Sequence, residues 1–385
     1  MHEIEYVSGK NIAASDQSTK DILKRGFFGT ETGGKLLLTI EEALYLMDVR
    51  NVVCRHKKGE ISFNELASKF WGAKKFMARY FAYREWRDRG LVIKDPSFVF
   101  QSQGKLQTKA YPSSGLRMPE YRLSGVFFSN DLTVIIDDKE KGRELYDNFW
   151  LGQYGSYKAA ERGHLDKLDI YETAFLLEKG MLALTNVTQR DVIKTATSRR
   201  KEFPKLYEVY KDWREKGYVI KTGFKFGTHF RVYFPGAKPV REGTKDWAHS
   251  KHVIHVFPKE SRLLISEWAR AIRVAHSVRK TFILAVPGKL AEKKMRIDFV
   301  LFHRRGGEAE NPENSNPKYA MLSLNEEEYI GGKEFAGAIK EARSRGLDLI
   351  LAISDRETAV TYYKARQIRL SGSDSEYYEI DWFQP

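Results

Sequence analysis

Two segments of the chain are copies of one another. Residues 252–286 and 319–353 align without a gap at an offset of 67 and are identical at ten of 35 positions, most of them small or apolar. Self-similarity of this kind indicates that one structural unit occurs twice. We therefore expect the chain to fold as an assembly of repeated modules. The alternative is a chance similarity between two strand–helix–strand units.

The two copies differ mainly in their polar residues. At the same offset, His249 falls opposite Asn316, Arg273 opposite Lys340, and Lys280 opposite Leu347. The second copy has thus lost a histidine and a lysine while its apolar frame has survived. This pattern is typical of an active module followed by a degenerate, structural copy.

The front of the chain is duplicated as well. The clearest match joins YREWRDRGLVIK (83–94) and YKDWREKGYVIK (210–221). Further upstream, LTIEEALYL (38–46) matches LDIYETAFL (168–176), and FFG (27–29) matches QYG (153–155). These copies share no residues typical of catalysis beyond charged helix faces. The order along the chain is therefore two N-terminal units followed by two C-terminal modules.

Composition narrows the class of protein. The 385 residues suffice for several compact domains, and they include a single cysteine, Cys54. One cysteine excludes a disulfide framework and a cysteine-based zinc site, and it fits a reducing compartment. No run of 18 apolar residues and no N-terminal apolar signal segment is present. We expect a cytoplasmic protein without a membrane partner.

Charge separates the two C-terminal modules. Residues 199–305 hold 26 Lys and Arg against 10 Asp and Glu, whereas residues 306–385 hold 9 against 15. A basic region with interleaved aromatic residues is the electrostatic footprint of a nucleic-acid-binding domain. An acidic sister module repels nucleic acid but fits a basic protein surface. A solvated basic face without a ligand is the alternative.

Apolar spacing predicts the local elements. Helices are expected at 38–48 and 61–94 and again within 168–217, each series stopping at a glycine. GFKFGTHFRVYF (223–234) alternates as a strand would, and a second strand is expected at 251–257. A helix over 266–280 with Ser266 as N-cap, a buried strand TFILAV and a linker over 306–317 follow.

Three polar residues in the first copy are candidates for catalysis. Tyr233 lies at the end of the polar face of its strand, His249 precedes the next strand, and Lys280 closes the predicted helix on the side of Arg273. Each has an ordinary alternative: an amphipathic tyrosine, a solvated loop histidine, and a lysine that complements the helix dipole. His229 shares the face of Tyr233 and is a rival for the role of acid.

A metal site is not expected. His249, His252 and His255 are spaced by three, but on a strand His252 and His255 point to opposite faces. No carboxylate or cysteine completes a ligand set with them. We expect no metal ion and no cofactor.

The same residues carry a family resemblance. The blocks REKGYVIKTGFKFGTHFRVY, HSKHVIHVFP and ISEWARAIRVAHSVRK resemble the archaeal tRNA-splicing endonucleases, in the order that this family has them, and AHSVRK is highly specific. LDIYETAFLLEKG and AVTYYKARQIRL extend the likeness over nearly the whole chain. The arrangement resembles the single-gene, three-unit form of the enzyme.

The resemblance implies a mixed α/β fold, with duplicated N-terminal α/β domains and two C-terminal modules of restriction-endonuclease type, the second one degenerate. The expected domains are an extra N-terminal unit (1–98), the N-terminal domain of the catalytic unit (118–217) and the catalytic nuclease domain (218–305). A linker (306–317) and an inactive nuclease-like domain (318–385) follow.

By motif position, Tyr233, His249 and Lys280 match the family's catalytic triad. Arg273 matches an arginine that stacks on an extruded bulge nucleotide. A second stacking arginine is expected on the last strand of the module, where Arg304 or Arg296 would serve. The chain departs from the family here, because the loop after Val286 (PGKLAEKKM) lacks the usual acidic turn and Tyr-Tyr strand. The loop between Tyr233 and His249 is also longer than usual.

The implied reaction is cleavage of precursor tRNA at bulge–helix–bulge motifs by the RNA's own 2′-hydroxyl, without a metal. His249 suits the general acid and Lys280 the fixed cation, and by analogy Tyr233 is the base, although a phenol with an ordinary pKa is a poor base at neutral pH. One active and one inactive module per chain imply a homodimer. The acidic loop with Asp355 and Glu357 is the candidate for docking, or else an ordinary polar turn.

Two other function classes fit parts of the sequence. A non-catalytic RNA-binding scaffold would explain the basic region but not the retention of the three polar residues in one copy. A metal-dependent DNA nuclease of the same broad fold would need acidic residues beside Lys280, and the sequence has none there.

Overall fold

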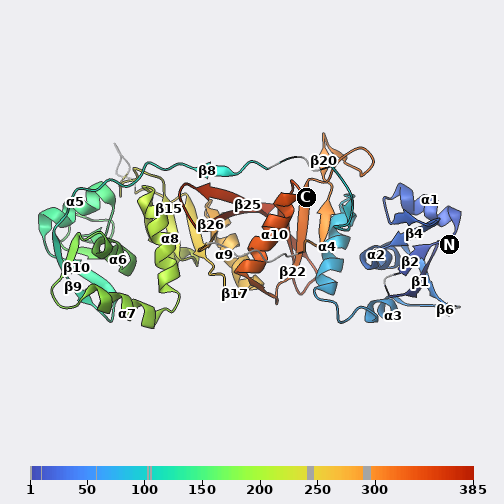
Figure 1. The fold of residues 1–385 in the computed structure, drawn as a ribbon, viewed down its shortest axis with the longest axis horizontal. Helices are drawn as coiled ribbons and strands as arrows, with labels where there is room; N and C mark the ends of the chain where they lie inside the picture. The colour runs from blue at the N-terminus through green and yellow to red at the C-terminus, as the bar shows by residue number, and fades with distance from the viewer. Residues whose placement is uncertain are drawn as a thin grey trace.

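One long sheet occupies the middle of the molecule, and a small α/β domain lies at each end of it (Figure 1). The computed structural model describes residues 2–9, 11–57, 59–101, 104, 106–240, 247–288 and 296–385. Helices and strands are interspersed along the chain, so the prediction of a mixed α/β fold is confirmed. Within the described residues, no helix is both long and apolar enough to cross a membrane.

The order of the strands in the central sheet is nearly symmetric about its middle. In spatial order its strands are β14 (Val219–Thr222), β15 (Phe230–Tyr233), β16 (His252–Val256), β18 (Thr281–Val286), β26 (Glu376–Phe383), β25 (Val360–Leu370), β24 (Asp348–Ser354), β22 (Tyr319–Asn325), β19 (Phe299–Leu301) and β7 (Ile93–Lys94). β16 and β18 are parallel, and so are β22 and β24. The first five strands therefore correspond, in reverse order, to the last five.

The matching elements recur at the offsets found in the sequence. The offset that aligns the two C-terminal copies relates β17 (Arg262–Leu264) to β23 (Tyr329–Gly331). The same offset relates α9 (Ile265–Ser277) to α10 (Gly332–Ser344). The offset that aligns the two N-terminal copies relates α4 (Phe76–Asp88) to α8 (Phe203–Glu215). We call residues 123–286 with 376–383 half I, and residues 3–94 with 299–370 half II.

The two small domains complete the halves. In half II the domain comprises β1 (Glu3–Ser8), β2 (Asn11–Ala14), α1 (Gln17–Arg25), β3 (Thr30–Thr32), β4 (Lys35–Leu38), α2 (Ile40–Arg50), β5 (Val53–His56), β6 (Gly59–Glu60) and α3 (Phe63–Ser68). In half I it comprises β9 (Leu123–Phe128), β10 (Thr133–Ile136), α5 (Lys139–Phe149), β11 (Gln153–Tyr154), β12 (Asp166–Leu168), α6 (Ile170–Glu178), β13 (Leu182–Leu184) and α7 (Gln189–Arg199). β8 (Lys109–Tyr111) lies in the crossover between them and pairs with β25.

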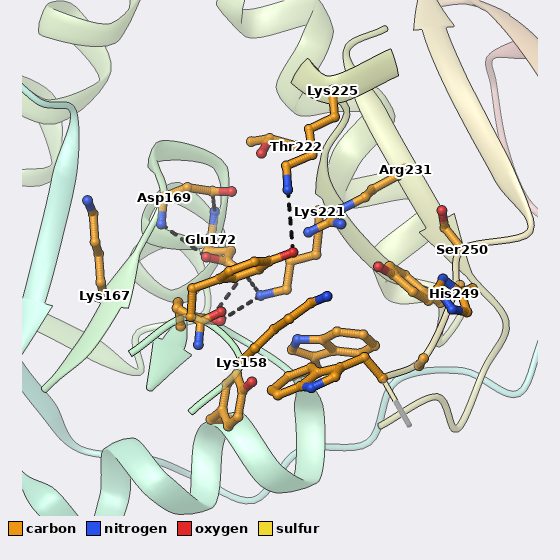
Figure 2. A pocket seen from close by; sticks show the side chains of 18 of the residues that line it. Lys158, Lys167, Asp169, Glu172, Lys221, Thr222, Lys225, Arg231, His249 and Ser250 are labelled. Atoms are coloured by element: carbon orange, nitrogen blue, oxygen red, sulfur yellow. Dashed lines mark hydrogen bonds and ion pairs between the residues drawn. The ribbon is translucent and has the colours of Figure 1, made fainter. Parts of the chain in front are cut away.

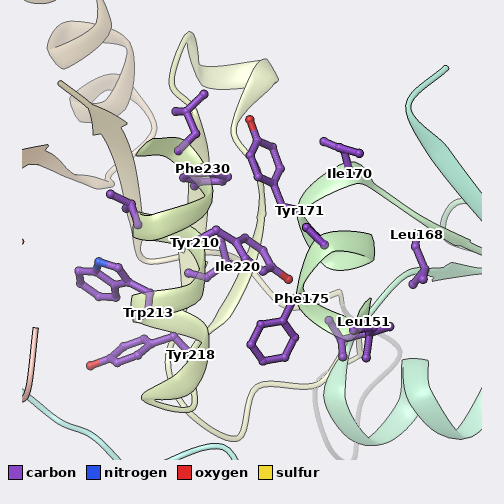
Figure 3. Close-up of a cluster of buried hydrophobic side chains, with 14 of the residues drawn as sticks. Leu151, Leu168, Ile170, Tyr171, Phe175, Tyr210, Trp213, Tyr218, Ile220 and Phe230 are labelled. Carbon is purple, nitrogen blue, oxygen red and sulfur yellow. The ribbon is translucent and has the colours of Figure 1, made fainter. Parts of the chain in front are cut away.

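Helices cover both faces of the sheet. In β18, Phe282 and Leu284 pack into a core with α9 and α10, whereas Ile283 and Ala285 pack into a core with α8. A strand that is buried on both faces is apolar at successive positions, which explains the run TFILAV. Figure 3 shows the aromatic part of the second core, in which Tyr171, Tyr210 and Phe230 join α6, α8 and β15.

The last strand of the first module comes from the end of the chain. The sequence suggested that a strand soon after Val286 completes this module, yet the strand beside β18 is β26. β26 supplies the Tyr-Tyr pair, Tyr377 and Tyr378, that the loop after Val286 lacks. β19 instead pairs with β22 and β7 in half II. The expected domain boundaries stay a prediction, but strand pairing crosses them.

The prediction of a continuous strand before β16 is wrong. Residues 223–234 are not one strand, because Phe224–Phe226 form a 3₁₀ turn and Phe224 is 91% exposed. Gly227 ends this turn with φ +64°, a conformation that glycine adopts without strain.

The N-cap of α9 is Leu264 and not Ser266. The first amides of the helix need no side-chain cap, because Ile265 N and Ser266 N donate to the carbonyls of Glu328 and Glu326 in the other copy. The antiparallel pairing of β17 with β23 brings these carbonyls into place.

A buried ion pair joins the small domain of half I to the sheet. Lys221 on β14 donates from Nζ to the Gly152 carbonyl at 2.7 Å and to Glu172 Oε1 at 2.6 Å. Gly152 N in turn donates to the same carboxylate oxygen at 3.1 Å. The Lys221 and Glu172 side chains are only 10% and 3% exposed.

Half II repeats this arrangement with Lys94, Gly29 and Glu42. Lys94 Nζ donates to the Gly29 carbonyl at 3.1 Å, and Gly29 N donates to Glu42 Oε1 at 2.9 Å. Gly29 therefore corresponds to Gly152, so the segment that matches FFG is WLG (150–152). The match of FFG with QYG is wrong, since QYG begins directly after this segment.

Replacing Lys221 by methionine tests this joint. The variant leaves the buried Glu172 carboxylate and the Gly152 carbonyl without their cation, so we expect the free energy of unfolding to fall by about 3–5 kcal/mol. Lys179→Met is the control, because Lys179 and Glu215 form an exposed pair that contributes at most about 1 kcal/mol. Urea unfolding measures both. Equal losses in the two variants would contradict a structural role for the buried pair.

Candidate active site

The three candidate residues line one cavity. Tyr233, His249 and Lys280 surround a space of about 390 Å³ between the small domain of half I and the end of the central sheet that holds β14 and β15. The wall from the small domain includes Trp150 and Tyr157. Figure 2 shows His249 on the side of Ser250, facing the labelled lysines across the cavity.

Tyr233 is held rigidly at the end of β15. Its side chain is 4% exposed, and its ring lies 4.5 Å from that of Trp150. Burial raises the pKa of the Tyr233 phenol, while the positive charge of Arg231 lowers it. Without substrate, this environment favours the neutral phenol, so a base at this position needs help from nearby cations.

His249 is exposed at the rim of the cavity, in the loop that leads into β16. Residues 241–246 of this loop lie outside the described part of the chain. The length of the loop left the reach of His249 open in the sequence, and the structure brings His249 to the same cavity as Tyr233.

Lys280 reaches the cavity from the turn between α9 and β18. The helix ends at Ser277, and Arg279 adopts φ +54°, which reverses the chain before the strand. Lys280 is therefore not on the helix face of Arg273, as the helical spacing suggested. Its Nζ donates to the Ser250 carbonyl at 2.6 Å and lies 5.0 Å from the centre of the Phe226 ring. Burial, together with Arg231 and Lys251, lowers the pKa of Lys280.

The cavity is rich in cations. Besides Lys280, its lining includes Lys158, Lys167, Lys221, Lys225 and Arg231. Its acidic groups are engaged: Glu172 pairs with Lys221, and Asp169 accepts hydrogen bonds from the first amides of α6. An anionic ligand therefore fits the space, and side chains that carry or donate protons meet there with cations.

The small-domain contribution to this cavity was not found in the sequence. Trp150, Tyr157 and Lys158 follow α5 and lie far before Tyr233 along the chain. The αL conformation of Trp150, φ 46°, is shared by its counterpart Phe27, so it belongs to the repeated frame. No sequence signal distinguished Trp150 from Phe27.

His229 does not belong to this site. Its Nδ1 accepts a hydrogen bond from Val256 N at 2.9 Å, and its ring lies 4.6 Å from that of His255. Burial lowers the pKa of His229 to about 3 and that of His255 to about 4. A neutral, partly buried ring away from the cavity cannot serve as the acid there. Among the described residues, no group of three His, Cys, Asp or Glu side chains is arranged to hold a metal ion.

The other predicted site residues lie elsewhere. Arg273 is exposed on α9 and lines a second cavity of about 620 Å³ together with Trp382. Arg304 donates from Nη2 to the carbonyl of Arg89, which lines the same second cavity. Arg296 is exposed, and its charge is one of several that oppose the rise in the pKa of Asp298 caused by burial.

Neither Arg304 nor Arg296 lies on the strand that was expected to carry the second stacking arginine. Both were expected on the last strand of the module, but that strand is β26, EYYEIDWF, which carries no arginine. Part of the loop before Arg296, residues 289–295, lies outside the described residues. Stacking by Arg273, Arg304 or Arg296 remains a prediction.

The predicted docking loop follows β24. Asp355 Oδ1 accepts hydrogen bonds from Glu357 N and Ala359 N, both at 2.9 Å, so this carboxylate organises its own turn. Glu357 is exposed. Arg356 between them pairs with Glu326 and Glu327.

Half II has none of the three candidate residues. In the sheet, Val232 lies opposite His252, and Leu301 lies opposite Tyr319, which is the counterpart of His252 in the second copy. The residue after Val232 is Tyr233, and its counterpart after Leu301 is Phe302. Asn316 and Leu347 stand for His249 and Lys280 in the aligned copies. The ring of Phe98, from the crossover, packs edge-on against Phe302.

Comparison with known proteins agrees with these features. The family model of the tRNA intron endonuclease catalytic C-terminal domain matches residues 203–296, and that of the N-terminal domain matches residues 4–67. The tRNA-splicing endonuclease of Methanopyrus kandleri is 37% identical over 38% of this chain and 79% of its own length. Those of Methanococcoides burtonii and Methanosarcina mazei are 26% and 25% identical over 71% and 73% of this chain, and over 93% and 94% of their own lengths. The chain belongs to the family of archaeal tRNA-splicing endonucleases.

Proposed function

We propose that this tRNA intron endonuclease cuts precursor tRNA at bulge–helix–bulge motifs by attack of the 2′-hydroxyl beside the scissile phosphate. In this reaction the 2′-oxygen bonds to phosphorus and the bond from phosphorus to the 5′-oxygen breaks. The products are a 2′,3′-cyclic phosphate and a 5′-hydroxyl. The observation that carries the proposal is the meeting of Tyr233, His249 and Lys280 in one basic cavity, while half II has none of the three.

Each side chain has one role in this scheme. Tyr233 accepts the proton of the 2′-hydroxyl, and His249 gives a proton to the leaving 5′-oxygen. Lys280 stabilises the negative charge that develops on the phosphate oxygens, and its buried position strengthens this attraction. The reaction needs no metal ion, because RNA supplies the nucleophile and the protein supplies acid, base and cation.

The alternative functions make different demands. A scaffold would bind RNA with its basic surface but leave it intact, so cleavage of a bulge–helix–bulge RNA in EDTA contradicts it. A metal-dependent DNA nuclease would lose activity in EDTA and would not depend on the 2′-hydroxyl. A substrate with a 2′-deoxy sugar at the cleavage site is therefore expected to be inert here.

Single substitutions in the cavity are expected to affect chemistry more than binding. Lys280→Ala and His249→Ala should each lower the single-turnover cleavage rate at least about 10²-fold with RNA affinity little changed, since both residues act in the transition state. Asn316→Ala is the matched control, because Asn316 takes the place of His249 in half II. Arg273→Ala should instead weaken binding as well as rate, by about 1–3 kcal/mol, if it stacks on a base. A near-wild-type rate in either triad variant would overturn the site.

We also propose that two chains form the working enzyme. One chain holds one complete cavity, whereas a bulge–helix–bulge motif has two cleavage sites related by an approximate two-fold axis. A homodimer presents two cavities with matching symmetry, so that the shape of the RNA is recognised. Residues 306–385 have six more acidic than basic residues and residues 199–305 have sixteen more basic than acidic ones, so the loop at Asp355 and Glu357 would dock against a basic region of the partner.

Charge reversal in that loop tests the dimer. Because Asp355 also holds its own turn, the informative variant is Asp355→Asn with Glu357→Lys, which keeps the acceptor oxygen and reverses the exposed charge. Like charges at the interface should cost on the order of several kcal/mol, so sedimentation should show a monomer of 44.6 kDa instead of a dimer, with reduced cleavage. Glu308→Lys, an exposed acidic residue outside the loop, is the control. An unchanged dimer would make the loop a simple turn.

A further inference from the structure

We propose that Arg231 is a fourth catalytic residue, whose guanidinium binds the non-bridging oxygens of the scissile phosphate together with Lys280. The proposal rests on the reaction described above and adds a group to it. Its basis is the position of Arg231 in the cavity, its unused hydrogen-bonding capacity and its absence from half II.

Arg231 points into the cavity from the same strand as Tyr233. The two residues are separated by one position on β15, so their side chains share a face of the sheet. Arg231 lines the cavity, and its guanidinium carbon lies 5.9 Å from the centre of the Tyr233 ring. Figure 2 shows the side chain extending from the strand toward Lys221.

One donor of its guanidinium is not used by the part of the chain that the structure describes. The Nε atom is buried and has no partner there, although buried guanidinium donors are normally satisfied. The two acids among the described residues that line the cavity are engaged elsewhere, Glu172 by Lys221 and Asp169 by the start of α6. A buried donor without a partner, in a cavity that suits an anion, points to a ligand with acceptor oxygens.

Arg231 is also close to the other reacting groups. Burial raises the pKa of Tyr233 and the charge of Arg231 opposes this rise, whereas burial and the charge of Arg231 together lower the pKa of Lys280. Two like charges held this close repel each other unless an anion lies between them, and the phosphate of the substrate is such an anion. The planar fork of a guanidinium binds two phosphate oxygens at once, whereas the lysine acts as a point charge. The same charge would make the phenol of Tyr233 a better base.

The comparison of the two halves separates this role from a structural one. Val232 corresponds to Leu301 in the sheet register, so the counterpart of Arg231 is Val300. Val300 is fully buried in the same kind of strand, which shows that the fold itself needs no arginine here. Half II has therefore exchanged Arg231 for an apolar residue along with the triad, whereas the structural lysine on β14 is retained as Lys94.

The test compares Arg231→Gln and Arg231→Lys with the wild-type protein in single-turnover cleavage of a bulge–helix–bulge RNA. We expect Arg231→Gln to lower the rate about 10²–10³-fold with little change in RNA affinity, and Arg231→Lys to retain part of the activity. Arg143→Gln is the control, because Arg143 is on α5, is about half exposed and pairs with Asp147. Without the arginine, the pH at which the rate rises should also move upward, since the phenol loses a cation that favours its ionised form.

A sulfur substitution at the scissile phosphate shows whether Arg231 touches it. Replacing one non-bridging oxygen by sulfur should slow the wild type more than Arg231→Gln, because the variant has already lost the contact. An equal effect of sulfur in both proteins, or an Arg231→Gln rate within about threefold of wild type, would overturn the proposal. Arg231→Lys gives the same comparison if the glutamine variant does not fold. Full activity of Lys280→Ala would instead show that the proposed site itself is wrong.

Discussion

The antiparallel pairing of β25 with β26 is the contact on which the rest of the structure depends. These strands stand at the centre of the sheet, where β26 pairs with β18 of half I on one side and β25 pairs with β24 of half II on the other. Strand edges have unpaired amides and carbonyls, so each half would expose an edge if the pair were opened. The core under α9 and α10 crosses the same boundary, where Trp268 meets Phe335 at a ring distance of 5.5 Å. The two halves therefore share this core.

On this nearly symmetric frame the polar residues are distributed unequally. Lys221 and Lys94 perform the same task in the two halves, since each ties a small domain to the sheet. Tyr233 and Lys280, in contrast, have apolar counterparts, Phe302 and Leu347. An apolar residue at these positions avoids the cost of burying an unpaired polar group. Half II can then contribute packing there.

The cavity owes its character to the junction between two domains. The sheet supplies Tyr233 and the turn before β18 supplies Lys280, while the small domain supplies the Trp150 ring that packs on Tyr233. Burial alone would hold the phenol neutral, and the surrounding cations act in the opposite direction. The orientation of the small domain, fixed by the Lys221–Glu172 pair, thus influences how the tyrosine is protonated.

Much of this could be predicted from the sequence. The offset between the two C-terminal copies placed α9 and α10 correctly relative to each other, because their apolar positions match, and comparison of the copies singled out His249 and Lys280. These properties are local, or depend on comparing one segment with another. The contrast between a basic first module and an acidic second one is also a property of the sequence alone.

Other features were decided only by the tertiary structure. β19 and β26 both follow the first module along the chain, and nothing in their own residues determines which of them pairs with β18. Which of the two strands lies beside β18 depends on how all the strands of the sheet pair with one another. The turn at Arg279 directs Lys280 away from the helix face of Arg273, because the strand must return to the sheet. Arg231 looked like one more polar residue on a strand, and its lack of a partner became visible only when the small domain enclosed it, since burial is a property of the folded chain.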